Sequence, residues 1–385
     1  MAQTSVSAGI WQDLSGEIQT LKNKKLYRSL DLSRKNQIDF SSNDYLGLTE
    51  NPSIRKKTIE AVRHYGSGSG ASRLISGNLT IHELLEKKIA HFKHEESALI
   101  FSSGYLANLG AVTSLVDERD VVLVDRFDHA SLIDAARLSK AKLWVYPHND
   151  IDALRNLSER AKNFRRRLVL TDAYFSMDGD VAPLDRILNI CEETNSLLMI
   201  DEAHSTGVFG KTGRGLTEYF GLEGKIPVVM GTLSKALASG GGFIAGNYIL
   251  KETLINRARE FIYTTAPPPA ATGAALASLE WIEKNPQAIE KFWRMIRKTR
   301  EDLSEAGFDL MNSQGPIIPI VIGQTEKTLM FRDLLKKEGV FVSAIRPPTV
   351  PKNSDRIRVS LKATHTPDEI NCLIGALKKG RKKLG

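Results

Sequence analysis

The stretch Leu197-Leu198-Met199-Ile200-Asp201-Glu202-Ala203-His204 decides the fold class. Four apolar residues precede an acid, with no polar residue between them. A strand of this kind is buried on both faces, as in a parallel sheet with helices on each side. The acid that follows must be hydrogen-bonded or paired with a cation once it is buried. The stretch therefore predicts an inner strand of an α/β protein with a polar site at its carboxyl end.

Short apolar runs of this type recur between helical stretches from about residue 51 to residue 263. The further predicted strands are 98–101, 121–124, 168–171, 228–230 and 243–245. Such alternation predicts a mainly parallel sheet with helices on both faces. Because ligands of these sheets bind at the carboxyl ends of the strands, we expect the functional residues there.

The two ends of the chain differ from this pattern. Spaced apolar residues predict a helix over about 11–30 and a short strand over 38–40. We expect three parts: an N-terminal arm (1–50), a large domain that holds the site (51–270), and a smaller α/β C-terminal domain with its linking helix (271–385).

The C-terminal part contains its own start and stop signals. The run Ala266-Pro267-Pro268-Pro269 interrupts the alternation before a long helical region. Residues 317–322 and 356–361 are predicted strands, and the alternation of apolar and polar residues in the second predicts one buried face. Thr366-Pro367-Asp368-Glu369 predicts a capping box that opens the last helix. The basic run 378–383 predicts a frayed, solvated end.

The composition excludes several classes of protein. Of the 385 residues, 42% are hydrophobic and 25% are charged, so we expect neither a disordered nor a fibrous chain. The cysteines, Cys191 and Cys372, are too few for a disulfide framework or a zinc cluster and indicate a reducing, cytoplasmic location. We expect no membrane helix, because no apolar run approaches the roughly 20 residues that one needs.

The net charge of +8 leaves an anionic partner open. The basic residues are spread along the chain without interleaved aromatic residues, so we expect no nucleic acid. We expect no metal either, because His91 and His94 lack further ligands at a suitable spacing. The Gly-rich stretch Gly66–Ala71 follows a predicted helix, whereas a dinucleotide fingerprint follows a strand.

Three other strand ends carry residues suited to chemistry. The strand 98–101 leads into Ser102-Ser103-Gly104 and a helix that begins near Tyr105. The free N–H groups at the start of this helix form a cradle for phosphate. The strand 228–230 leads to Lys235 in a tight turn, where loss of water makes the amine nucleophilic. The strand 121–124 leads to His129.

Each of these features has a simpler explanation. Gly104 fits an ordinary tight turn, Asp201 and Lys235 fit a structural salt bridge, and His129 fits a capped turn. Taken together, however, they suit one ligand with a phosphate, a carbonyl, a flat ring and a ring nitrogen. Pyridoxal phosphate has all four.

Four motifs, in their order and spacing, carry a family resemblance. From Asn43 to Ala363 the chain resembles the α-oxoamine synthases, fold-type I pyridoxal-phosphate enzymes that join an amino acid to an acyl thioester with loss of carbon dioxide. The motifs are Ser41-Ser42-Asn43-Asp44-Tyr45-Leu46-Gly47, Phe175-Ser176-Met177-Asp178-Gly179-Asp180, Asp201-Glu202-Ala203-His204-Ser205-Thr206-Gly207 and Gly231-Thr232-Leu233-Ser234-Lys235-Ala236-Leu237. The segment 344–351 is most similar to the family member that condenses L-alanine with pimeloyl-CoA or a pimeloyl acyl carrier protein.

The resemblance implies roles for individual residues. Lys235 and His129 are the expected catalytic residues: Lys235 would hold the cofactor and take the Cα proton, and His129 would stack on its ring. Asp201 would keep the ring nitrogen protonated. The other expected cofactor-binding residues are Gly104, Tyr105, Ser176, His204 and Thr232. Candidates for substrate binding are Arg28, His129, Thr349, Arg356 and Arg358, where one of the last two can equally be a strand residue without that role.

The resemblance also implies a homodimer with the active site at the subunit interface, near the loop 68–77. One departure from the family pattern is Ala238, where a glycine is common; another is the segment Thr171-Asp172-Ala173-Tyr174, which replaces the more frequent Thr-Glu-Gly-Val. Two alternatives stay open. The chain can be a relative that uses glycine or serine or a longer acyl chain, or a non-catalytic partner subunit of the same fold.

Overall fold

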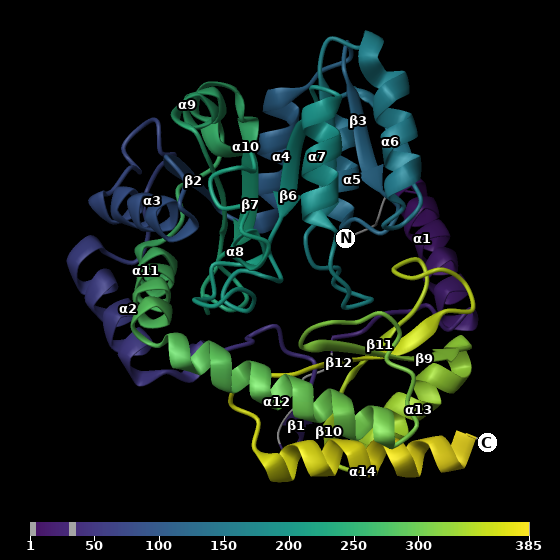
Figure 1. The fold of residues 1–385 in the computed structure, drawn as a ribbon. Helices are drawn as coiled ribbons and strands as arrows, with labels where there is room; N and C mark the ends of the chain where they lie inside the picture. The colour runs from purple at the N-terminus through teal and green to yellow at the C-terminus, as the bar shows by residue number, and fades with distance from the viewer. Residues whose placement is uncertain (1–4, 31–35, 385) are drawn as a thin grey trace.

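A computed structural model describes residues 5–30 and 36–384 (Figure 1), so 1–4 and 31–35 of the predicted arm and residue 385 lie outside the described part. Seven strands form the central sheet in the order β2-β8-β7-β6-β5-β3-β4, and only β8 runs antiparallel to its neighbours. The strands are β2 (Ser97–Phe101), β3 (Val121–Asp125), β4 (Lys142–Tyr146), β5 (Arg167–Asp172), β6 (Leu197–Asp201), β7 (Val228–Thr232) and β8 (Gly242–Gly246). The mainly parallel sheet predicted from the sequence is confirmed.

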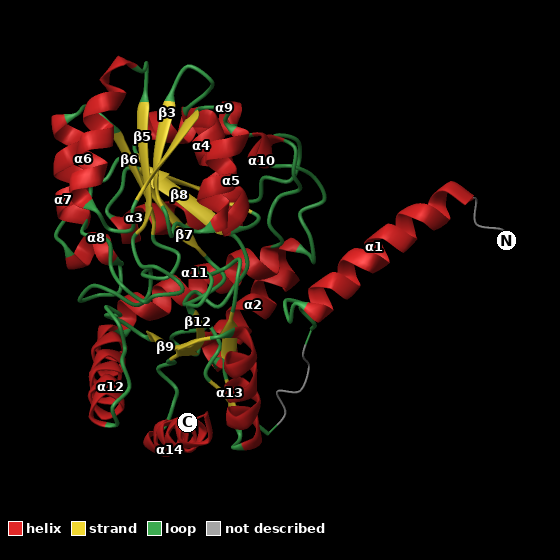
Figure 2. Cartoon of the chain, turned by 90° about the vertical axis from the view of Figure 1, so that its right-hand side faces the viewer, coloured by secondary structure: helices red, strands yellow, loops and turns green. Residues whose placement is uncertain are grey.

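Alternate residues of each strand enter two separate hydrophobic cores, one on each face of the sheet. In β3, Val121 and Leu123 belong to one core, and Val122 and Val124 belong to the other. Figure 2 shows the helices that cover the two faces, with α6 and α7 on one side and α4, α5 and α9 on the other. Burial on both faces is the reason that the strands lack polar alternation.

The helices of this part connect or flank the strands. They are α2 (Pro52–Tyr65), α3 (Thr80–Lys93), α4 (Gly104–Leu115), α5 (Ala130–Leu138), α6 (Ile151–Arg160), α7 (Leu184–Glu193), α8 (Leu216–Tyr219), α9 (Tyr248–Arg257) and α10 (Arg259–Ile262), with short 3-10 turns at Leu48–Glu50 and Ala161–Asn163. The long helical region that follows the proline run consists of α11 (Pro269–Lys284) and α12 (Pro286–Glu305).

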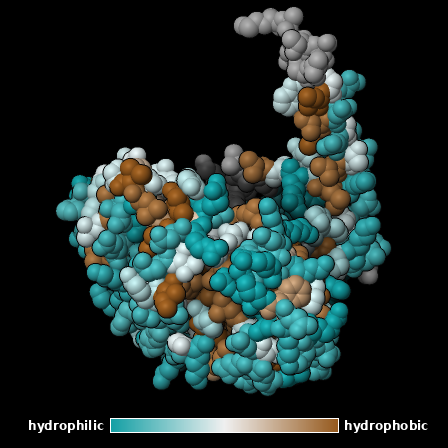
Figure 3. All heavy atoms as spheres, turned by 90° about the horizontal axis from the view of Figure 1, so that it is seen from above, coloured by the Kyte–Doolittle hydropathy of each residue, from teal (hydrophilic) through white to brown (hydrophobic). Residues whose placement is uncertain are grey.

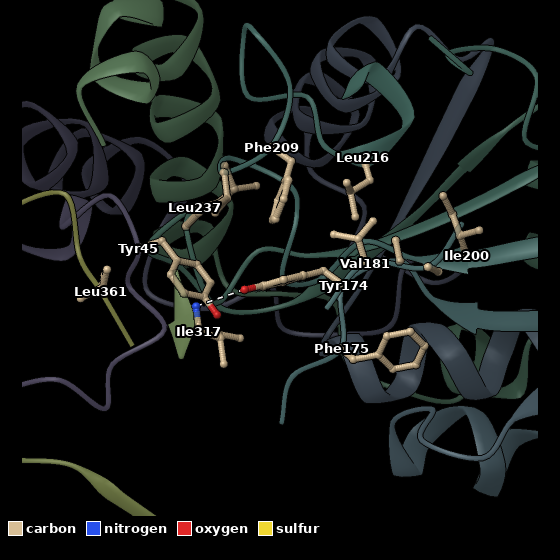
Figure 4. Close-up of a cluster of buried hydrophobic side chains, with 14 of the residues drawn as sticks. Tyr45, Tyr174, Phe175, Val181, Ile200, Phe209, Leu216, Leu237, Ile317 and Leu361 are labelled. Atoms are coloured by element: carbon tan, nitrogen blue, oxygen red, sulfur yellow. Dashed lines mark hydrogen bonds between the residues drawn. The ribbon is translucent and has the colours of Figure 1, made fainter. Parts of the chain in front are cut away.

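The C-terminal part forms a second, smaller sheet. Strands β9 (Ile317–Gly323), β11 (Ser343–Ile345) and β12 (Asp355–Ser360) pair antiparallel in the order β11-β12-β9. Helices α13 (Thr325–Lys337) and α14 (Pro367–Leu384) accompany them, and β1 (Ile38–Asp39) of the arm pairs with β10 (Val340–Phe341). Figure 4 shows the core that joins the two parts, where the backbone N–H of Ile317 donates to Tyr174 Oη at 3.1 Å.

The capping box at the last helix is confirmed. The N–H of Glu369 donates to Thr366 Oγ1 at 3.2 Å, and the N–H of Thr366 donates to a Glu369 carboxylate oxygen at 2.8 Å. Both bonds satisfy backbone donors that the start of a helix leaves unpaired.

Four details of the sequence interpretation were wrong. The first helix, α1, spans Ser5–Asn23 rather than about 11–30. Strand β4 was missed because it lies at the sheet edge, where its residues are partly exposed and lack a fully apolar run. Strand β12 is buried along its whole length, not on one face, because its arginines are paired with polar groups. The basic end continues α14 to Leu384 instead of fraying at 378–383. No described helix is long and apolar enough to cross a membrane.

Candidate active site

The carboxyl ends of β3, β5, β6 and β7 surround a cavity of about 250 Å³. Residues that are far apart in the sequence meet there because neighbouring parallel strands end at the same edge of the sheet. The predicted residues that line it are Gly104, Tyr105, His129, Asp201, His204, Thr232 and Lys235. A larger cavity of about 570 Å³ between α2 and α11 contains none of the predicted residues.

One end of the cavity is the start of helix α4, which can hold a phosphate. Ser103 caps this helix by accepting from the N–H of Leu106 at 3.1 Å, and within the described residues the N–H groups of Gly104 and Tyr105 keep no protein acceptor. A Cβ at Gly104 would lie 2.9 Å from Met230 Cε and 3.3 Å from Thr232 Oγ1. The start of α4 therefore lies this close to β7 only because residue 104 has no side chain, and its free N–H groups suit an anion.

The Asp201 carboxylate is fixed in place at the bottom of the cavity. Its Oδ2 accepts from Asn108 Nδ2 at 2.8 Å, and its Oδ1 accepts from the N–H of Ala203 at 2.8 Å. Asn108 Nδ2 also donates to Ser131 Oγ at 2.8 Å. A buried, oriented anion of this kind suits a protonated ring nitrogen.

Lys235 is the buried amine of the site. Burial lowers its pKa from 10.5 to about 8, although the nearby carboxylates of Asp201 and Asp172 favour the charged form. A lysine with such a pKa has a substantial neutral fraction near pH 8, which is the form that attacks a carbonyl or accepts a proton.

The turn after Lys235 explains one departure from the family pattern. Ala238 has a φ of +51°, a left-handed conformation that glycine adopts without steric cost. The glycine that is common at this position thus has a conformational reason.

The two histidines of the cavity are held in defined orientations. Nδ1 of His129 accepts from the N–H of Ser131 at 3.3 Å and lies 2.7 Å from its hydroxyl, so His129 also caps α5. His204 Nδ1 lies 2.7 Å from the hydroxyl of Tyr45. Burial lowers the pKa of His129 and lowers that of His204 well below its usual range. Both rings are therefore neutral near pH 7.

Two residues of the site were not predicted from the sequence as functional. Asn108 lies one turn after Gly104 on α4, and helical spacing identifies it once the site is known. Asp172 ends β5 and is the register partner of Asp201. Its Oδ2 accepts from the N–H of His129 at 2.7 Å. Burial, then the Asp201 charge, raise the pKa of Asp172 well above the ordinary value. An acid directly after an apolar strand was the signal for Asp201, and the same signal identifies Asp172.

The structure distinguishes the two arginines of β12. Arg356 donates to a carboxylate oxygen of Asp178 at 2.5 Å, so its charge is already neutralised. Arg358 donates to the carbonyl of Ser176 at 2.7 Å and to Asn43 Oδ1 at 3.0 Å, both uncharged acceptors. Its charge also lowers the pKa values of His204 and Lys235. Of the two arginines, Arg358 is therefore the one whose charge acts on residues of the cavity, although neither arginine lines it.

Besides the two arginines, three predicted residues lie outside the cavity and a fourth lies at its edge. Ser176 does not line it and contributes its carbonyl to Arg358. Arg28 and Thr349 contact each other at 3.3 Å, but neither lines the Lys235 cavity of the same chain. Tyr105 lines the edge, where its hydroxyl donates to Asp134 at 2.5 Å.

Comparison with known proteins identifies the family. The chain matches the family described as aminotransferase class I and II over residues 35–377. It is 42% identical to an 8-amino-7-oxononanoate synthase of Symbiobacterium thermophilum, over 96% of this chain and 97% of the relative. It is also 42% identical to the enzyme of the same name from Geobacter sulfurreducens, over 97% and 99% of the two chains.

Solved structures are similar over nearly the same extent. A serine palmitoyltransferase from S. paucimobilis with bound PLP is 28% identical, with a TM-score of 0.91 over 100% of both chains. An 8-amino-7-oxononanoate synthase from Francisella tularensis is 29% identical, with a TM-score of 0.78 over 90% of this chain and 98% of that one. The chain therefore belongs to the 8-amino-7-oxononanoate synthase family, within the aminotransferase class I and II fold, and is a pyridoxal-phosphate protein.

Proposed function

We propose that this protein joins L-alanine to a pimeloyl thioester, with loss of carbon dioxide, to form 8-amino-7-oxononanoate for biotin synthesis. The observation that carries the proposal is 42% identity to synthases of that name over nearly the whole of both chains, together with a cavity that presents the cofactor residues. Because both cysteines are free thiols, we place this activity in the reducing cytoplasm.

Each polar residue in or near the cavity has a different role in this reaction. Bound pyridoxal phosphate supplies an electron sink for the carbanion at the substrate Cα. The neutral amine of Lys235 can take the Cα proton and return it, and Asp201 keeps a negative charge beside the ring nitrogen. Arg358 is the candidate partner of a substrate carboxylate, since a guanidinium matches the geometry of that group.

A second candidate is the condensation of serine or glycine with another acyl thioester. The observation in its favour is the TM-score of 0.91 to serine palmitoyltransferase, which exceeds the 0.78 to the Francisella synthase. Both reactions need the same cofactor residues, so the cavity near Lys235 does not discriminate between them. The substrates must be compared directly.

The test is a matrix of turnover rates. Alanine, glycine and serine are combined with pimeloyl, acetyl, succinyl and palmitoyl thioesters, each on coenzyme A, and the pimeloyl thioester also on acyl carrier protein. We expect the highest kcat/KM with alanine and a pimeloyl thioester. A clear preference for serine with palmitoyl-CoA would support the second candidate instead.

A non-catalytic subunit of the same fold is distinguished by colour. We expect the purified protein to absorb visible light through a bond between the cofactor and Lys235, and Lys235→Ala to lose this band. A colourless protein that pyridoxal phosphate cannot reconstitute would indicate the partner-subunit reading.

We also propose that the protein is a homodimer with the active site at the interface. Helix α1 projects from the rest of the chain, and Figure 3 shows apolar residues along it. Ile10, Trp11, Leu14, Ile18 and Leu21 are all exposed. A stripe of this kind at helical spacing needs a partner surface, and a second copy of the chain supplies it.

A further inference from the structure

A second cavity, of about 620 Å³, lies between the end of the arm and strand β11. We call it the basic cavity, because the described residues that line it include five cations and no acid. The five are Lys22, Lys25, Arg28, Arg332 and Arg346. Its apolar lining comes from residues such as Leu329 and Ile345. A site of this composition suits a ligand with both anionic and apolar parts.

The cations of the basic cavity are crowded together. Arg346 donates to the backbone carbonyls of Lys25 and Tyr27, which hold the arm beside β11. Burial, and then the charges of Arg332 and Arg28, lower the pKa of Arg346.

Two carboxylates lie near this cluster without lining the cavity. Asp333 accepts from Arg332 at 2.7 Å, and Asp355 opposes the lowering of the Arg346 pKa. Among the described residues, two acids beside five cations leave the cavity with a positive field, which attracts an anion.

The basic cavity lies beside the strand that pairs with Arg358, whose charge lowers the pKa of Lys235. Ser343 lines it and is the register partner of Arg358 across β11 and β12. The hydroxyl of Ser343 also donates to Ser41 at 3.0 Å, and Asn43, two residues later, accepts from Arg358. One strand, β11, therefore lies between the basic cavity and Arg358.

We propose that the basic cavity binds the phosphate at the outer end of a phosphopantetheine arm whose thioester reaches the Lys235 site. This inference rests on the proposed function, which requires an acyl thioester. Coenzyme A and acyl carrier protein share this phosphate, and both are anionic beyond it. Guanidinium forks and lysine ammonium groups are the side chains that bind phosphate best.

The test compares thioesters with and without the phosphate. Pimeloyl-CoA and pimeloyl acyl carrier protein contain it, and pimeloyl-pantetheine lacks it. The variant is Lys22→Gln combined with Arg332→Gln, which leaves the Arg346 contacts to the arm intact. We expect the ratio of kcat/KM for a phosphorylated thioester to that for pimeloyl-pantetheine to fall about tenfold, which is about 1.4 kcal/mol. The fall is larger at low salt, because exposed charges are screened.

The matched control is Arg294→Gln. Arg294 is an exposed arginine of α12 that pairs with Glu290 and lies outside the basic cavity. This control removes one positive charge from the protein while the ratio stays as in the wild type. A change in overall stability or in the Lys235 site alters both kinds of thioester alike and so leaves the ratio unchanged.

The outcomes show which molecule supplies the phosphate and whether the proposal holds. A fall with pimeloyl-CoA alone identifies coenzyme A, and a fall with the carrier protein alone identifies that partner. An unchanged ratio with both overturns the proposal. Calorimetry can compare the dissociation constants of coenzyme A and pantetheine in the wild type and the variant. This comparison needs no turnover, so it tests the inference even if the proposed reaction is absent.

Discussion

The amine of Lys235 has a reactivity set by its surroundings rather than by its own chemistry. In water a lysine is almost fully charged at neutral pH and is a poor nucleophile. Here burial lowers its pKa to about 8, and this effect outweighs the two nearby carboxylates. A lysine at the end of an apolar strand thus becomes reactive because the fold removes water from it.

We predict that pyridoxal phosphate attaches to the cofactor-free protein faster as the pH rises, with a half-maximal rate near pH 8. The reason is that only the neutral amine of Lys235 attacks the carbonyl. Asp201→Asn removes an anion that favours the charged amine, so its midpoint moves below 8. Stopped-flow absorbance between pH 6 and 11 gives both midpoints, with Lys235→Ala as the blank. A wild-type midpoint near the ordinary 10.5 would contradict the burial of this amine.

At the scale of one element, β12 contains two arginines that differ in the charge of their partners. Arg356 is paired with Asp178, whereas Arg358 contacts a carbonyl and an amide oxygen. An alternating sequence does not distinguish them, because both are spaced identically with respect to the apolar residues. The difference arises from the turn 175–180, which presents a carboxylate to one arginine and a carbonyl to the other.

We predict opposite effects of the two substitutions. Arg358→Gln raises KM for a carboxylate substrate about tenfold or more and changes stability little, since its protein partners are neutral. Arg356→Gln leaves the half-buried Asp178 without its buried cation, so it lowers the free energy of unfolding by about 3 kcal/mol and changes KM little. Urea denaturation and steady-state kinetics on both variants measure the contrast. Equal KM effects would remove the distinction between the two residues.

An ion-pair network links the turn 175–180 to the end of β3 through His148. His148 Nδ1 lies 2.9 Å from Asp125, and its Nε2 lies 2.7 Å from Asp180. Although burial opposes the charge, the two carboxylates raise the pKa of His148 to about 10. The network continues to the active site, because Asp128 accepts from the N–H groups of Asp125 and Asp172.

We predict that His148→Gln destabilises the protein by about 3 kcal/mol at pH 6, because two carboxylates lose their shared cation. A histidine whose folded pKa is raised contributes fully below its unfolded pKa of about 6.5 and loses that contribution as the pH approaches 10. The difference between wild type and variant therefore shrinks from pH 6.5 to 10. Denaturation curves across this range check it, and a difference that stays constant with pH would refute a charged His148.

At the scale of the whole molecule, α1 is the part whose sequence and environment do not match. Its apolar side chains recur at helical spacing and form one face, as in an amphipathic helix that packs on a core. Trp11 on this face is nevertheless 63% exposed. The division into an arm, a large domain and a small domain at residues 50 and 270 stays a prediction. A partner surface for α1 would make the arm part of an assembly.

We predict a dimer in sedimentation equilibrium, and a shift toward monomer in Trp11→Glu combined with Leu14→Glu. Charges placed on the exposed apolar face cannot be buried against a second copy without a large cost. Gln12→Glu adds charge to the same exposed helix but lies on the opposite side from this face, so it leaves the dimer intact. A wild-type protein that sediments as a monomer and retains full activity would overturn the interface proposal.

The sequence by itself determined the class of fold and predicted many of the residues that line the Lys235 cavity. Unbroken apolar runs can be buried only on both faces, and the polar residues that follow them collect at one edge of a parallel sheet. Gly104, His129, Asp201 and Lys235 were identified in this way. Local pattern was enough because each of these residues directly follows a strand or lies a few positions after one.

Only the tertiary structure decided which of the remaining polar residues act together. Asn108 joins Asp201 from another element, Asp178 neutralises Arg356 but not Arg358, and the arm brings its cations beside β11. These contacts join positions that are tens to hundreds of residues apart. Their charges and pKa values depend on burial and on neighbours, which no local pattern of residues contains.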